Sequence, residues 1–127
     1  MNVDRRFRHL LNKLVNAQID LAAYLQLRRA KGYMSVSDND HLRENCFDLC
    51  GELRENAAAF SPSLAPAQSE ALHAAGEALA SAAVCLMSGH HDCPSFIVVN
   101  PDALQRCLDT LAVNIQVINK SAPMAHA

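Results

Sequence analysis

The side chains of this sequence best suited to chemistry are five cysteines and six histidines, and few of them are spaced as ligands would be. Cys46 and Cys50 are four residues apart, so that in a helix both thiols lie on one face. Downstream, His90, His91 and Cys93 fall in one turn. Thiolates and imidazoles are common ligands of Zn²⁺ and Cu⁺. These five residues are therefore the candidate metal ligands, and Cys85 and Cys107 could complete a site.

The same cysteines also fit a packed helical core. Cys46 lies between Leu42 and Leu49 at helical spacing, and no pair has the Cys-x-x-Cys spacing of a zinc site. A free cysteine packs as a small hydrophobic side chain. We therefore favour core packing over metal binding, and we expect no cofactor.

His9 carries a second alternative. In the run from Phe7 to Val15, a histidine is followed by Asn12 at the third place and by apolar residues. This run resembles the phosphoacceptor box of histidine kinase dimerisation hairpins, and the resemblance covers about residues 5–61. It implies a phosphotransfer or dimerisation hairpin, in which Lys13 would help to neutralise a phosphoryl group on His9. No glycine-rich nucleotide motif follows in the sequence, which excludes kinase activity.

Other enzymatic motifs are missing from the sequence. It contains no phosphate-binding loop and no Gly-x-Ser-x-Gly nucleophile motif. Glu70 and His73 form one Glu-x-x-His, whereas a di-iron bundle needs two and further inward glutamates. We predict no catalytic residue, and a non-enzymatic function through self-association and protein–protein interaction.

Four apolar repeats of helical period must position these residues. They predict helices over about residues 3–30, 38–59, 65–88 and 101–119, hence an antiparallel up-down-up-down four-helix bundle. Gly32 suits a helix C-terminus, Ser37 with Asp40 resembles a capping box, and Asn100 suits an N-cap. Residues 1–120 form the predicted domain, and 121–127 a flexible tail. Residues 96–99 could be a short strand but have no evident partner.

The charge distribution constrains partners and compartment. Residues 1–36 carry seven basic and two acidic residues, a net +5, and the remainder carries four and eleven, a net −7. We expect the first helix to lie against the acidic second helix rather than on nucleic acid, because its basic residues are split between its two ends. No apolar run of about 20 residues could span a membrane. With no secretory signal and no disulfide pattern, we expect a cytoplasmic protein.

The last predicted helix has apolar residues on nearly every side. Val113 and Val117 lie outside the repeat that ends in Leu111, Ile115 and Ile118. A helix that is apolar all round is buried all round. We therefore predict a homodimer with Val113 and Val117 in its interface, or else a central position for this helix.

Overall fold

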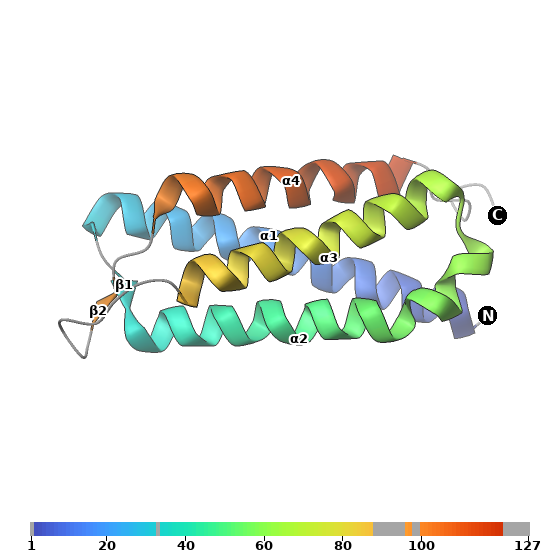
Figure 1. The fold of residues 1–127 in the computed structure, drawn as a ribbon, viewed down its shortest axis with the longest axis horizontal. Helices are drawn as coiled ribbons and strands as arrows, with labels where there is room; N and C mark the ends of the chain where they lie inside the picture. The colour runs from blue at the N-terminus through green and yellow to red at the C-terminus, as the bar shows by residue number, and fades with distance from the viewer. Residues whose placement is uncertain (1, 33, 88–95, 98–99, 121–127) are drawn as a thin grey trace.

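Four antiparallel helices make up most of the computed structural model, which describes residues 2–32, 34–87, 96–97 and 100–120. The helices are α1 (Asn2–Lys31), α2 (Val36–Phe60), α3 (Pro66–Met87) and α4 (Pro101–Lys120). Each runs opposite to its predecessor, so that the predicted up-down-up-down bundle is confirmed (Figure 1). The predicted tail and the segment with His90, His91 and Cys93 lie outside the described residues.

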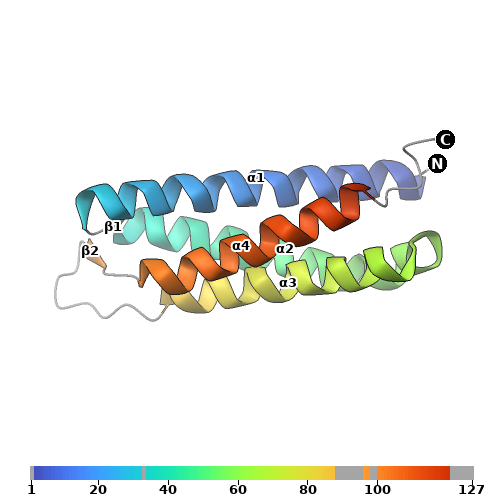
Figure 2. The same cartoon turned by 90° about the horizontal axis from the view of Figure 1, so that it is seen from above.

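The helices occupy the corners of a square in chain order. Each contacts the one before and the one after, and α4 closes the ring on α1. Figure 2 shows α1 and α3 on opposite sides of the bundle. The closest packing is that of α3 on α2 and α4, because the buried face of α3 carries alanines where α1 carries larger side chains. The buried alanines of α3 are Ala71, Ala75, Ala78, Ala82 and Ala83.

Most of the predicted apolar repeats form one core. Leu14, Leu21, Leu79, Leu86 and their neighbours are buried as their spacing predicts. Burial of this apolar surface is the main favourable term in folding. On α2, Ala57 is exposed although it follows the buried Leu53 by four residues and so lies on the same side of the helix.

Two buried amides link helices through main-chain carbonyls. Asn39 of α2 accepts a hydrogen bond from the Tyr24 hydroxyl and donates one to the Leu86 carbonyl oxygen, both at 2.7 Å. Gln68 of α3 donates to the Ile118 carbonyl oxygen at 3.2 Å. The acceptors lie in the last turns of α3 and α4, where carbonyls have no partner within the helix. These amides therefore fix the ends of α3 and α4 in the bundle.

Helix termini follow the sequence closely, with one correction. Asn100 caps α4 by accepting from the amide of Ala103, and Gly32 ends α1 with φ +86°. Helix α2, however, begins at Val36 rather than 38, and its N-cap is Ser35 rather than Ser37. The Ser35 hydroxyl accepts from the amide of Asp38 at 3.1 Å, which satisfies one free amide of the first turn.

The chain crosses between helices by a 3-10 turn, η1 (Ser61–Ser63), and a two-residue strand pair. Strand β1 (Met34–Ser35) pairs antiparallel with β2 (Phe96–Ile97), with Met34 opposite Ile97. The expectation that residues 96–99 find no strand partner is therefore wrong. The partner lies in the α1–α2 connection, which the bundle brings to the same end.

Candidate interaction surface

The cysteine pair on α2 is buried in the core. Cys46 and Cys50 have little exposed surface, whereas Cys85 and Cys107 are half-buried, and none of these four described cysteines forms a disulfide. Burial raises the pKa of Cys46 to about 12, and the nearby Asp20 and Cys107 add to the shift. Such a thiol stays protonated at neutral pH and packs as a small apolar side chain.

Cys107 lies beside Cys85, across the contact between α3 and α4. Burial raises the pKa of Cys107 to about 11, and the hydrogen-bonded thiol of Cys85 contributes to the rise. Among residues 2–32, 34–87, 96–97 and 100–120, no three cysteine, histidine or acidic side chains are grouped as metal ligands. His90, His91 and Cys93 lie outside these ranges, so the metal hypothesis that includes them remains a prediction.

His9 is exposed on α1 at the rim of a shallow pocket of about 360 Å³. Arg5 and Arg6 line the same pocket. Lys13, which the kinase-hairpin resemblance would place on a phosphoryl group, instead forms an ion pair with Glu52 at 2.8 Å between Nζ and Oε1. This contact joins basic α1 to acidic α2, as the charge distribution predicts. The phosphoacceptor role of His9 stays a prediction.

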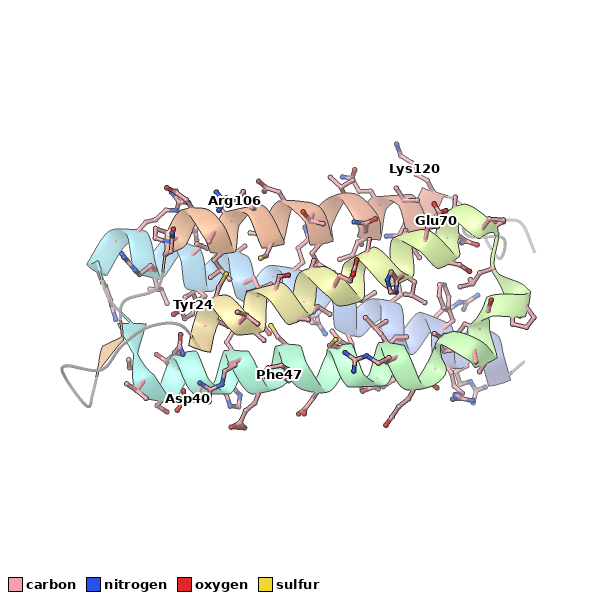
Figure 3. All side chains as sticks on the ribbon, viewed as in Figure 1. Tyr24, Asp40, Phe47, Glu70, Arg106 and Lys120 are labelled. Atoms are coloured by element: carbon pink, nitrogen blue, oxygen red, sulfur yellow. The ribbon has the colours of Figure 1, made fainter. Side chains whose placement is uncertain are left out.

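The outer face of α4 is polar. Its exposed positions are Asp102, Arg106, Asp109, Thr110, Val113, Gln116, Asn119 and Lys120. Val113 is thus the one apolar side chain exposed on this described helix, whereas Val117 packs against the core. The interpretation of this helix as apolar on nearly every side is therefore wrong, because its apolar residues other than Val113 lie on one buried or half-buried face. Figure 3 shows Arg106 and Lys120 projecting from α4. The predicted interface at Val113 and Val117 is not tested by this arrangement.

A groove of about 520 Å³ lies between α2 and α3 on the surface of the bundle. In Figure 1 the two helices are closest near the β1–β2 end and diverge toward η1. Leu53 and Leu72 supply apolar surface to the groove, and the exposed Ala57 lies on its α2 wall. Cys50, Leu64 and Ala80 complete the apolar lining.

Gly76 deepens this groove. A Cβ at Gly76 would lie 3.5 Å from Leu53 Cδ1, which is an ordinary van der Waals contact. Packing inside the chain therefore does not require glycine there, and glycine in a helix interior costs roughly 1 kcal/mol relative to alanine. The missing side chain leaves the groove open at the cost of helix stability.

Exposed apolar side chains extend the groove toward the β1–β2 end. Phe47 is one turn before Cys50 on α2, and Val84 is one turn after Ala80 on α3. Their exposed fractions are 43% and 59%. Figure 3 shows Phe47 about midway along α2. The groove and these two side chains form one surface, which we call the α2/α3 face.

Two side chains of opposite charge, Arg54 and Glu77, lie on the two sides of the groove. Arg54 lines it from α2, with Nη2 3.5 Å from Cys50 Sγ, and Glu77 lines it from α3, with Oε2 3.7 Å from His73 Nε2. Arg54 and Glu77 directly follow Leu53 and Gly76, and Leu53 Cδ1 lies 3.5 Å from where a Cβ of Gly76 would be, so that Arg54 and Glu77 lie near each other along the bundle.

The apolar repeats do not predict the α2/α3 face. The one signal for it in the sequence is the small size of Ala57 and Gly76, which lie on two helices that face each other. A groove between them depends on how far α2 and α3 diverge, which an apolar repeat does not report.

The chain is thus a four-helix bundle that presents an apolar groove between α2 and α3. The chain belongs to the family described as biofilm formation protein (YliH/bssR), whose model matches residues 1–126. It is 54% identical to the "Biofilm regulator BssR" of Escherichia coli strain K12, of Escherichia coli O157:H7 and of Shigella flexneri, over 127 residues and the full length of both chains. No solved structure matches it. No described helix is long and apolar enough to cross a bilayer.

Proposed function

We propose that this chain is a non-enzymatic regulator of biofilm formation that acts by contact with protein through the α2/α3 face. The observation that carries the proposal is the groove itself, with Phe47 and Val84 exposed beside it. Exposed apolar surface of this kind is typical of interaction sites. The names of the relatives supply the process, biofilm regulation.

The proposal includes self-association and a cytoplasmic location. None of the four described cysteines, Cys46, Cys50, Cys85 and Cys107, forms a disulfide, and disulfides are rare in reducing compartments. This supports the cytoplasm.

A pair of neighbouring alanines offers a matched test of the groove. Ala57 and Ala58 are both exposed on α2, but only Ala57 lines the groove. An arginine at either position stays in solvent, so that both variants should keep the fold. We expect Ala57→Arg to block the groove and Ala58→Arg to leave it open.

The assay is biofilm mass in an Escherichia coli K12 strain that lacks its own relative of this chain. The wild-type chain and Ala58→Arg should shift biofilm mass to the same level, and Ala57→Arg should leave it at the level of the empty vector. Circular dichroism and the cellular amount of each variant control for folding. Equal activity of two folded, equally abundant variants would contradict the proposed role of the groove.

A further inference from the structure

We propose that the occupant of the α2/α3 face is a second copy of this chain, related to the first by a two-fold axis parallel to the bundle. This inference rests on the proposed function, since it names the partner of the same groove. It places self-association on α2 and α3 rather than on Val113 and Val117 of α4.

The charges of the groove select this axis. A two-fold axis parallel to the helices places α2 of one copy on α3 of the other. Rotation about this axis does not change the position of any residue along the length of the bundle. Arg54 then comes near Glu77 of the second copy, because the two residues directly follow Leu53 and Gly76, which lie within contact distance of each other in one chain. A two-fold axis perpendicular to the helices, in the plane of the face, would instead place α2 of one copy on α2 of the other. Arg54 would then not lie opposite Glu77 of the second copy.

The apolar side chains match under the same operation. Phe47 and Val84 are each seven residues from Arg54 and Glu77, both in the direction of the β1–β2 end, so that these two side chains also lie near each other along the bundle. Phe47 of each copy therefore meets Val84 of the other. Two apolar contacts and two ion pairs result from one symmetry axis, which is the self-complementarity that a two-fold contact requires.

The face is large enough for a stable dimer. Helix α3 has 22 residues, so that it is about 33 Å long at 1.5 Å per residue. Two adjacent helices, each about 10 Å across, give roughly 660 Å² per copy. The total of roughly 1,300 Å² falls within the range of about 1,200–2,000 Å² that specific interfaces bury.

Other surfaces suit a second copy less well. On α4, Val113 is surrounded by polar exposed positions such as Asp109, Thr110 and Gln116. On α1, Ile19 and Leu27 are exposed apolar residues, but neither lines the α2/α3 groove or the pocket at His9. The α2/α3 face combines an apolar groove with opposite charges.

Val84 and Val113 provide a matched pair for the test. They are the same residue type, with exposed fractions of 59% and 58%, on α3 and α4. An aspartate at either position stays in solvent in the single chain. We therefore expect Val84→Asp and Val113→Asp to fold alike, as circular dichroism and thermal melting would show.

The measurement is sedimentation velocity of the full chain at micromolar concentrations. We expect the wild type and Val113→Asp to sediment as dimers, and Val84→Asp to require at least a tenfold higher concentration to dimerise. Phe47→Asp should behave as Val84→Asp does. A monomeric wild type, equal dissociation of both valine variants, or dissociation of Val113→Asp alone would each overturn the proposed contact.

The biofilm assay separates this inference from the proposed function. If the wild type is a monomer and Ala57→Arg is inactive, the groove does not bind a second copy of this chain but still contacts a different protein. The opposite result is a dimeric wild type, a monomeric Val84→Asp, and full biofilm activity of both Val84→Asp and Ala57→Arg. This result would support the proposed dimer but would contradict its role in regulation.

Discussion

Replacing Asn39 with alanine should destabilise the bundle by about 3 kcal/mol, because two buried polar groups each lose a partner worth about 1–3 kcal/mol. The hydroxyl of Tyr24 loses its acceptor, and the carbonyl of Leu86, in the last turn of α3, loses its donor. Asn39 has no exposed surface, so that water does not replace it without a local rearrangement.

Tyr24→Phe is the matched partial variant. It leaves only the Asn39 oxygen without its donor, so that we expect a loss of roughly 1.5 kcal/mol. Because both variants break the same hydrogen bond, the double variant should lose less than the sum of the two.

Urea unfolding followed by far-UV circular dichroism measures these differences at constant m. A loss below about 0.5 kcal/mol for Asn39→Ala, or strict additivity in the double variant, would refute the reasoning, since surface substitutions of no consequence fall within that range.

Gly76→Ala should stabilise the chain by about 0.5–1 kcal/mol in urea unfolding, because α3 gains helix propensity and the new Cβ meets Leu53 without a clash. Stability should fall as pH rises from 9 to 12, because the unfolded chain releases the Cys46 proton near 9.0 while the folded chain holds it to about 12; the loss is at most ~4 kcal/mol, and Cys46→Ala should reduce it. After incubation with acetyl phosphate, we expect no more acid-labile phosphate on the wild-type chain than on His9→Ala. Acid-labile phosphate that is present on the wild type and absent from His9→Ala would establish the phosphotransfer function of His9 instead. Elemental analysis of the full chain should find less than one metal ion for ten chains, whereas a stoichiometric metal lost in His91→Ala would favour the metal reading.

The fold could be predicted from the sequence because its main signal is periodic. The spacing of Leu14, Leu21, Leu79 and Leu86 fixes which face of each helix is buried, and Gly32 and Asn100 mark helix ends by their conformational preferences. The start of α2 was missed because Ser35 and Ser37 have the same capping chemistry. The strand pair was missed because its two members are far apart in the sequence and each has only two residues.

The candidate surface was predictable only in part. Sequence reasoning expects a contact on the helix with the most apolar residues, which placed it at Val113 and Val117. The helix that carries those residues buries one face in the usual way. The groove instead arises from the divergence of α2 and α3 and from the small size of Ala57 and Gly76, which line it; no single-helix pattern reports that divergence.

A charge-swap mixture tests the proposed contact most directly. Arg54→Glu alone would set glutamate against Glu77 of the second copy, and Glu77→Arg alone would set arginine against Arg54, so that each variant should be a monomer by sedimentation velocity. In an equimolar mixture, both ion pairs of the two-fold contact are opposite in sign again, so that we predict recovery of the dimer at the wild-type sedimentation coefficient. A mixture that remains monomeric, or single variants that remain dimers, would contradict the pairing of Arg54 with Glu77 across the α2/α3 face.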